Sequence, residues 1–465
     1  MEPHILERAE HPISRHDIDP DVLKVLYRLI KAGHIAYLVG GGVRDLMLGR
    51  RPKDFDVATD AHPQQVRDLF RNSRLIGRRF RLVHVFFGPK NIEVATFRRR
   101  SEEASENDPL IRSDNTFGTP EEDAFRRDFT VNALFYDPQT FRVIDYAGGV
   151  ADLRARLIRT IGDPELRMRE DPVRMMRAVR FAAKLGFQIE SSTRAAIDRH
   201  RADLLKASIP RLVEETYRTI GQTGASRAIA LMEEFGLLEL LFPFLASHLR
   251  AGPHPLENCH TSRNLAALGE AISNNAQLGH EEVLAAIFLD VHLAGAAVDH
   301  GCERPNLIGE LRMRGFAKAD VENMRVLLET YPLLAEPSRR TRRIIRRPQF
   351  ERLRRFFEMM APGYDCDTSR LASFIANPDS YLAAQGGIAP RIPGRHSRRR
   401  RRRRRARPTD RSHLVNQGTQ PSSVASPALI SATSSDGRVG GVAREMEPRR
   451  EQSAAWPDRT SITKS

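Results

Sequence analysis

Apolar residues in the first 150 positions alternate between helical and strand spacing. Apolar positions at helical spacing predict a helix over 21–32. Short apolar runs predict strands over 37–39, 54–58 and 92–97, and a last strand of this region begins at Val143. This mixture predicts an α+β domain with a small mixed sheet and helices packed against it.

After residue 150 the apolar pattern is helical only. The clearest helix takes Asp171 as its N-cap and Pro172 as its first residue, and it stops at Gly186. One side of this helix is apolar, while cations gather on the opposite side at Arg174, Arg177, Arg180 and Lys184. Amphipathic segments continue to residue 385, which predicts all-α architecture for this part of the chain.

These patterns divide the 465 residues into four parts. We expect a head over 1–150, a helical neck over 151–220, a helical body over 221–385 and a tail over 386–465. The tail holds 18 Lys and Arg against 6 Asp and Glu, so it supplies +12 of the net charge of +15. Because like charges repel along this Gly-, Pro- and Ser-rich stretch, we expect a disordered basic tail that binds a polyanion, nucleic acid first.

Cysteine usage and hydropathy bear on the compartment. Three widely spaced cysteines, Cys259, Cys302 and Cys366, argue against a disulfide framework and favour a reducing cytoplasm. No run of 18 apolar residues is present, so no membrane span is expected. We therefore expect a cytoplasmic protein.

Candidate chemistry is concentrated between residues 37 and 57. A glycine turn, Gly40-Gly41-Gly42, connects a predicted strand to a predicted helix, an arrangement that lets backbone N–H groups approach a phosphate. Asp54 and Asp56 follow on the next predicted strand, where residues two apart share one face. Two carboxylates on one face beside a phosphate cradle suit a pair of Mg²⁺ ions.

The run from Gly40 to Asp45, followed by Asp54-Phe55-Asp56, resembles the head of the class II nucleotidyltransferases of the DNA polymerase beta superfamily. This group comprises the CCA-adding enzymes and the bacterial poly(A) polymerases. The resemblance implies a polymerase-beta-like nucleotidyltransferase head with all-α neck and body domains. It also implies ATP as substrate and two Mg²⁺ ions held by Asp54 and Asp56, with Mn²⁺ able to substitute.

Further motifs carry the resemblance and imply roles for single residues. Gly40, Gly41, Arg44 and Asp45 would bind the nucleotide through its triphosphate. Arg126-Arg127-Asp128 resembles the motif that binds ribose and phosphates, and a helix after it carries Asn132 as a further polar contact. Glu170-Asp171-x-x-Arg174 resembles the motif that reads the incoming base, and Arg177 follows on the same helix. The third active-site acid is left open between Glu93 and Asp128.

Basic residues outside these motifs point to RNA. The segment 75–87 resembles one that marks bacterial poly(A) polymerases, and its arginines either contact phosphates or form a solvated turn. A second basic segment at 339–347 is also expected to contact RNA. The residues that we expect to bind RNA are Arg78, Arg79, Arg81, Arg180, Lys184 and, in the tail, Arg398, Arg401 and Arg405.

The sequence thus favours template-independent addition of AMP from ATP to RNA 3′ ends, in support of RNA processing and decay. The expected partners are RNA 3′ ends, ATP and RNA-decay proteins. A CCA-adding enzyme acting on tRNA is the nearest alternative, because the head motifs are common to both activities. An RNA-binding protein with an inactive head is the alternative of another class, and the presence of all four candidate acids argues against it.

Overall fold

The computed structural model describes residues 2–77, 81–99, 116–252, 259–297 and 306–385. Its N-terminal part is built on a mixed sheet in which eight described strands pair in the order β1-β8-β7-β2-β3-β6-β5-β4. Only β3 and β6 run parallel, and the other neighbours are antiparallel. The strands are β1 His4–Leu6, β2 Ala36–Val39, β3 Asp56–Thr59, β4 Ser73–Ile76, β5 Leu82–Phe87, β6 Lys90–Thr96, β7 Leu134–Asp137 and β8 Arg142–Asp145.

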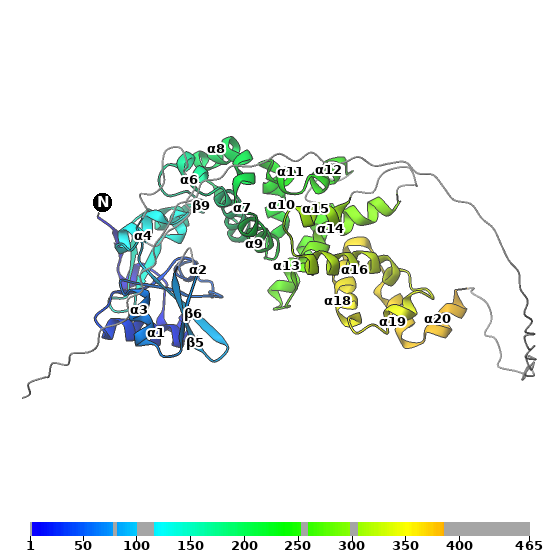
Figure 1. Ribbon diagram of the computed structural model, residues 1–465, viewed down its shortest axis with the longest axis horizontal. Helices are drawn as coiled ribbons and strands as arrows, with labels where there is room; N and C mark the ends of the chain where they lie inside the picture. Colours follow the sequence, from blue (N-terminus) through cyan, green and yellow to red (C-terminus); the bar gives the residue numbers. More distant parts are fainter. Residues whose placement is uncertain (1, 78–80, 100–115, 253–258, 298–305, 386–465) are drawn as a thin grey trace, which may run out of the picture. The chain divides into compact units, whose positions relative to one another are not determined.

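Helices cover this sheet: α1 packs against β2 and β3, and Figure 1 shows α3 beside β5 and β6. The first helix, α1 (Pro20–Lys31), begins because the Asp19 carboxylate accepts a hydrogen bond from the N–H of Asp21, and Pro20 occupies its first turn. Its apolar face buries Val22, Val25, Leu26 and Leu29. The other helices of this region are α2 Gly41–Met47, α3 Pro63–Leu69, α4 Pro120–Arg126 and α5 Gly149–Ala155.

Two predicted elements of the head differ from the structure. The strand expected from residue 54 begins at Asp56, because its partner β2 ends at Val39 and the chain turns away at Gly40. Asp54 therefore lies in the loop before β3. The helix expected after Asp128 is a single 3-10 turn, η3 (Thr130–Asn132), because the chain enters strand β7 directly afterwards.

The rest of the described chain is helical, apart from a short pair of parallel strands, β9 (Leu157–Ile158) and β10 (Gln188–Ile189). The sequence predicted an all-α neck and did not indicate these strands. The helices to residue 220 are α6 Pro164–Glu170, α7 Val173–Leu185, α8 Ser191–His200 and α9 Ile209–Ile220. The later helices are α10 Ala225–Glu234, α11 Leu237–Leu241, α12 Pro243–Ala251, α13 His260–Ser273, α14 His280–Ala297, α15 Leu307–Met313, α16 Lys318–Ala335, α17 Thr341–Ile344, α18 Phe350–Met360, α19 Thr368–Ala376 and α20 Pro378–Ala384.

Most buried apolar side chains of the sheet and the helices form one connected core that runs from Leu6 to Leu371. A second, smaller cluster in the sheet region contains Val39, Phe97 and Phe135. The α+β class is confirmed by this arrangement of a mixed sheet followed by helices. The domain boundaries at 150, 220 and 385 stay a prediction, and the tail lies outside the described residues. None of the described helices is both long and apolar enough to cross a membrane.

Gly149 sets the contact between α5 and the turn η3. A Cβ at this position would stand 2.2 Å from the carbonyl oxygen of Thr130 and 3.1 Å from a methyl of Leu134. The backbone N–H of Gly149 donates to the Asp145 carboxylate at 2.9 Å, which fixes the start of α5. Only glycine lets this helix approach η3, the turn that ends at Asn132.

We therefore expect Gly149→Ala to destabilise the protein by about 1–3 kcal/mol, because the added methyl must displace backbone. Urea unfolding of the full chain measures the change. The matched control is Gly295→Ala in α14, where no described atom lies within 4 Å of the added Cβ and a gain of up to about 1 kcal/mol is expected. Equal unfolding midpoints for Gly149→Ala and the wild type would contradict the packing described here.

Candidate active site

A cleft of about 500 Å³ lies between the glycine turn, the residues just before β3, the Arg127–Asn132 segment and helices α7 and α9. Its lining includes eleven Lys and Arg side chains and five carboxylates from the described residues. The predicted residues that the fold brings to this cleft are Gly40, Gly41, Arg44, Asp45, Asp54, Asp56, Arg127, Asp128, Asn132, Asp171, Arg174, Arg177, Arg180 and Lys184. A cationic cleft of this size suits a nucleoside triphosphate.

The glycine turn forms one wall of the cleft. Gly40 has a φ of +71°, which glycine adopts without strain, and its N–H donates to the carbonyl of Leu134. A Cβ on Gly40 would meet a guanidinium nitrogen of Arg127 at 3.0 Å, so the absence of a side chain lets Arg127 lie against the turn. The turn and this arginine therefore line the cleft together.

Three carboxylates lie at or near the start of β3. Asp56 pairs in register with Glu93 of the parallel strand β6, and Asp54 precedes it by two residues. Loss of surrounding water raises the pKa of Asp56 to about 6, with repulsion from Glu93 and Asp54 acting in the same direction and Arg127 opposing it. The carboxylates thus repel one another at neutral pH.

That repulsion is the feature of this structure that fits divalent metal ions, since a cation bound between carboxylates removes it. The residues suited to hold Mg²⁺ are Asp54 and Asp56, which both line the cleft. The described residues contain no set of three or more His, Cys, Asp or Glu side chains in a ligating arrangement. Substrate oxygens would therefore have to complete the coordination, as is usual for Mg²⁺ in phosphoryl transfer.

Asp128, the other candidate for the third acid, is engaged differently. It accepts hydrogen bonds from Nε of Arg177 at 2.7 Å, from Nδ2 of Asn132 at 3.1 Å and from the N–H of Phe129 at 2.8 Å. Burial raises the pKa of Asp128, but the charge of Arg177 and these hydrogen bonds outweigh it and hold the pKa well below its usual range. Glu93 is the candidate that lies beside Asp56, and it also approaches Nε2 of His84 at 3.3 Å.

Arg44 is almost fully enclosed, with 3% of its side chain exposed. Its Nη1 donates to the Asn132 side chain at 2.6 Å, and its Nε and Nη2 donate to Asp45 at 2.8 and 2.7 Å. The guanidinium therefore joins α2 to η3 and fixes Asn132. Its predicted contact with the triphosphate stays a prediction, and most of its donors already have partners.

The predicted base-reading pair, Asp171 and Arg174, is held in place by other side chains. Arg211 of α9 donates to both carboxylate oxygens of Asp171, at 2.8 and 2.7 Å. Burial raises the pKa of Asp171, but the hydrogen bonds and the charge of Arg211 lower it by more. The net shift of the Asp171 pKa is therefore downward. Arg174 donates to the carbonyl of Arg167 at 2.8 Å and to Glu170 at 3.2 Å.

The predicted cap of α7 is wrong. Asp171 follows the last residue of α6, the cap position of α7 is occupied by Pro172, and the helix starts at Val173. The Asp171 carboxylate instead accepts two hydrogen bonds from Arg211, because a bidentate, charge-assisted contact is stronger than a bond to a neutral helix N–H. The predicted stop at Gly186 is confirmed by its φ of +76°.

The cationic side of α7 faces the cleft. Arg177 joins Asp128, and Arg180 donates to Glu215 at 2.5 Å while lying 4.2 Å above the ring of Phe181. Lys184 is half-buried, which lowers its pKa, and it makes no ion pair with a described residue. Lys184 is therefore available to an anionic ligand.

Sequence reasoning missed Arg211 and Glu215 of α9, which lie 40 and 35 positions from their partners Asp171 and Arg180. No pattern in the sequence connects these two residues with their partners. They meet because α9 packs against α7. Of the other arginines predicted to bind RNA, Arg81 is exposed just before β5. Arg78, Arg79, Arg398, Arg401 and Arg405 lie outside the described residues.

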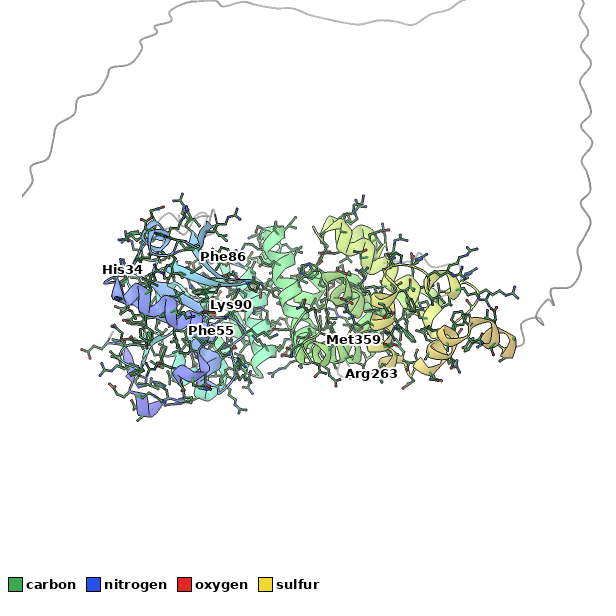
Figure 2. All side chains as sticks on the ribbon, turned by 90° about the horizontal axis from the view of Figure 1, so that it is seen from below. His34, Phe55, Phe86, Lys90, Arg263 and Met359 are labelled. Carbon is green, nitrogen blue, oxygen red and sulfur yellow. The ribbon has the colours of Figure 1, made fainter. Side chains whose placement is uncertain are left out.

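A second cleft, of about 1010 Å³, adjoins the first. It shares Asp54 and Asp56 with the first cleft and is also lined by Glu93. Figure 2 shows Phe55 and Lys90, two of its lining residues, on the same side of the head. The two predicted metal ligands thus lie where two clefts meet.

Residues 36–159 match the family model described as the poly A polymerase head domain. Residues 186–249 match the model described as the probable RNA and SrmB-binding site of polymerase A. Over these two segments, which together make up less than half of the chain, the protein is similar to poly(A) polymerases. These matches bear out the resemblance that the sequence predicted.

Similar proteins include both poly(A) polymerases and CCA-adding enzymes. A poly(A) polymerase I of Escherichia coli O6:H1 is 51% identical over 263 residues, which are 54% of this chain and 56% of the relative. A CCA-adding enzyme of Bacillus velezensis is 40% identical over 220 residues, 47% of this chain and 54% of the relative. The chain thus spans about half the length of these curated relatives.

Similarity to a solved structure extends over more of the chain. An apo CCA-adding enzyme matches with a TM-score of 0.56 and 22% identity, over 85% of this chain and 90% of the other. This likeness concerns the fold, and it includes the helical part after the head.

The ion pair between Asp128 and Arg177 gives a pH-dependent contribution to stability. Because the folded-state pKa of Asp128 is lowered, its contribution is complete above the ordinary carboxyl pKa and is lost as the pH falls below that value. We expect Asp128→Asn to lower the free energy of unfolding by about 3 kcal/mol at pH 7, because a partly buried Arg177 loses its counterion.

Chemical denaturation from pH 7 to pH 3 measures this, and the gap between the two proteins should narrow at the acid end. Asp137→Asn is the matched control, since Asp137 bonds only to its own turn in the described structure and should show a small difference. A gap that stays constant across this range would contradict the ion pair's role.

Proposed function

We propose that this protein is a template-independent polynucleotide adenylyltransferase that adds AMP from ATP to RNA 3′ ends. The observation that carries the proposal is the position of Asp54 and Asp56 at the junction of two clefts. A nucleotidyl transfer needs two substrates whose reacting atoms meet at one point. The poly(A) polymerase I relatives favour ATP and RNA as those substrates.

In this proposal the cationic cleft takes the nucleotide. Its triphosphate lies along the glycine turn, with Arg127 and Lys184 as cations for the phosphates. Asp128, fixed by Arg177 and Asn132, accepts a hydrogen bond from a ribose hydroxyl. Two Mg²⁺ ions, held by Asp54 and Asp56, would supply charge neutralisation at the triphosphate and at the attacking oxygen.

The second cleft takes the RNA 3′ end. Glu93 lines this cleft beside Asp56 and is placed to orient the terminal hydroxyl. The 3′ oxygen forms a bond to the α-phosphorus, the bond to the pyrophosphate oxygen breaks, and the hydroxyl proton leaves to solvent. Catalysis is then mainly positioning and charge stabilisation.

Base choice rests on Asp171 and Arg174, an acceptor and a donor at fixed spacing. Their partners, Arg211 and Glu170, hold both groups in one orientation without a nucleic acid template. A role in RNA decay, RNA-decay proteins as partners and a cytoplasmic location are further parts of this proposal. CCA addition to tRNA is the second candidate, favoured by the CCA-adding relatives.

Primer extension with each NTP separately tests the proposal. With 5′-labelled RNA and Mg²⁺, we expect a long ladder with ATP alone. Asp54→Asn and Asp56→Asn should each reduce the rate by about 1000-fold or more, which corresponds to roughly 4 kcal/mol of lost transition-state stabilisation. RNA affinity should stay near that of the wild type.

A control on a tRNA that lacks its end separates the two candidates. Addition that requires CTP before ATP, or that stops after one A, would replace the proposal by CCA addition. Extension that survives both aspartate substitutions would contradict the assignment of the metal ligands.

Arg211→Gln tests the base-reading arrangement. Without its bidentate partner Asp171 is free to reorient, so we expect the ratio of kcat/KM for ATP to that for CTP to fall by about 10-fold. Arg218→Gln is the matched control, because Arg218 also lines the cleft but pairs with Glu214 and not with Asp171. Equal losses for all nucleotides in both variants would show that Arg211 contributes only charge.

A further inference from the structure

The segment 339–347 contains six arginines, and the short helix α17 lies within it. Thr341 and Ile344, three residues apart, are 0% and 4% exposed and attach the helix to the core. The Thr341 hydroxyl donates to the carbonyl of Leu333 at 2.8 Å. This anchoring leaves the arginines on the outer side of the segment.

Five of these arginines have no counterion in the described structure. Arg342 pairs with Asp379, but the other five are exposed and make no ion pair with a described residue. We call these five the arginine patch, and they are Arg339, Arg340, Arg343, Arg346 and Arg347. The nearest acids in sequence are Glu336 and Glu351, and the latter already pairs with Arg354.

Many arginines elsewhere in the body are paired with acids, and the unpaired ones that the structure describes, Arg227, Arg263 and Arg312, are scattered and do not form a cluster in the sequence. Arg325 lies between Glu322 and Glu329, and Arg354 lies between Glu351 and Glu358. A cluster of exposed, uncompensated like charges is unfavourable for folding by itself. No contact within the described protein therefore accounts for this cluster of arginines. Binding of an external anion would account for it.

We infer that the arginine patch is a second RNA-binding surface, which holds phosphates of the RNA chain beyond the nucleotides in the clefts. The inference rests on the proposed function for the identity of the anion. Guanidinium groups bind phosphates bidentately, and several phosphates in one flexible strand can match several arginines.

Other observations show where this surface lies in the chain and limit which ligand can cover it. The patch lies outside the residues matched by the two family models, and none of its residues lines either cleft. The tail carries a net charge of +12, so it repels the patch and is unsuited to cover it. RNA held here would extend the contact of the enzyme with long substrates only.

Equilibrium RNA binding by the full chain without ATP tests the inference. The patch variant is R343Q/R346Q/R347Q, and the matched control is R325Q/R354Q/R370Q, which removes the same charge from arginines that pair with acids. We expect the patch variant to bind a long single-stranded RNA about 10-fold more weakly and to lower the salt dependence, d log K/d log [KCl], by about 2. The control should change affinity less than about 2-fold.

A short oligonucleotide completes the design, and it should bind the wild type and the patch variant equally. Equal loss in both triple variants, unchanged affinity in the patch variant, or equal loss on short and long RNA would overturn the inference. Unchanged RNA affinity would instead favour an acidic protein as the occupant. Should the patch variant melt early, Arg347→Gln alone must still show a smaller loss confined to long RNA.

The two proposals can fail separately. A wild-type protein that adds no AMP but still binds long RNA through the patch would contradict only the proposed function. Normal AMP addition with patch-independent RNA binding would contradict only the second RNA-binding surface.

Discussion

The site depends on the ion pair between Asp128 and Arg177. Asp128 follows α4 in the sheet region, and Arg177 lies on α7, so this contact fixes the helix against the segment that carries the nucleotide-binding residues. Glu215 of α9 extends the pair by bonding Arg180, and Arg167 adds hydrogen bonds to the carbonyls of Arg126 and Arg127. The cleft exists because these charges on separate elements are matched.

At two positions in the cleft the charge of a side chain is not balanced by the protein. These are the positions where ligands are expected. Asp56 has a raised pKa because it is withdrawn from water and because the repulsion from Glu93 and Asp54 is only partly offset by Arg127. Lys184 has a lowered pKa because it is half-buried without an ion pair in the described structure. One point lacks positive charge and the other lacks negative charge, so a metal-bound triphosphate would satisfy both.

The sequence was sufficient for the features that depend on local chemistry. The glycine turn at Gly40, the carboxylates Asp54 and Asp56 and the stop at Gly186 all follow from residue type and spacing, and the structure brings the first two into one cleft. The sequence could not show which carboxylate pairs with which arginine. Asp171 was predicted as a helix cap because its partner, Arg211, is 40 positions away and no local pattern connects them. Strand β3 was predicted too long, because its first pairing depends on where β2 ends.

The most direct test of this account is equilibrium binding of ATP and CTP to the protein with Mg²⁺ and no RNA. If Asp171 and Arg174 are held in a base-reading arrangement by the protein alone, ATP should bind about 10-fold more tightly than CTP, a difference of roughly 1.4 kcal/mol. Equal affinities for the two nucleotides would contradict the claim that this ion-pair arrangement selects the base.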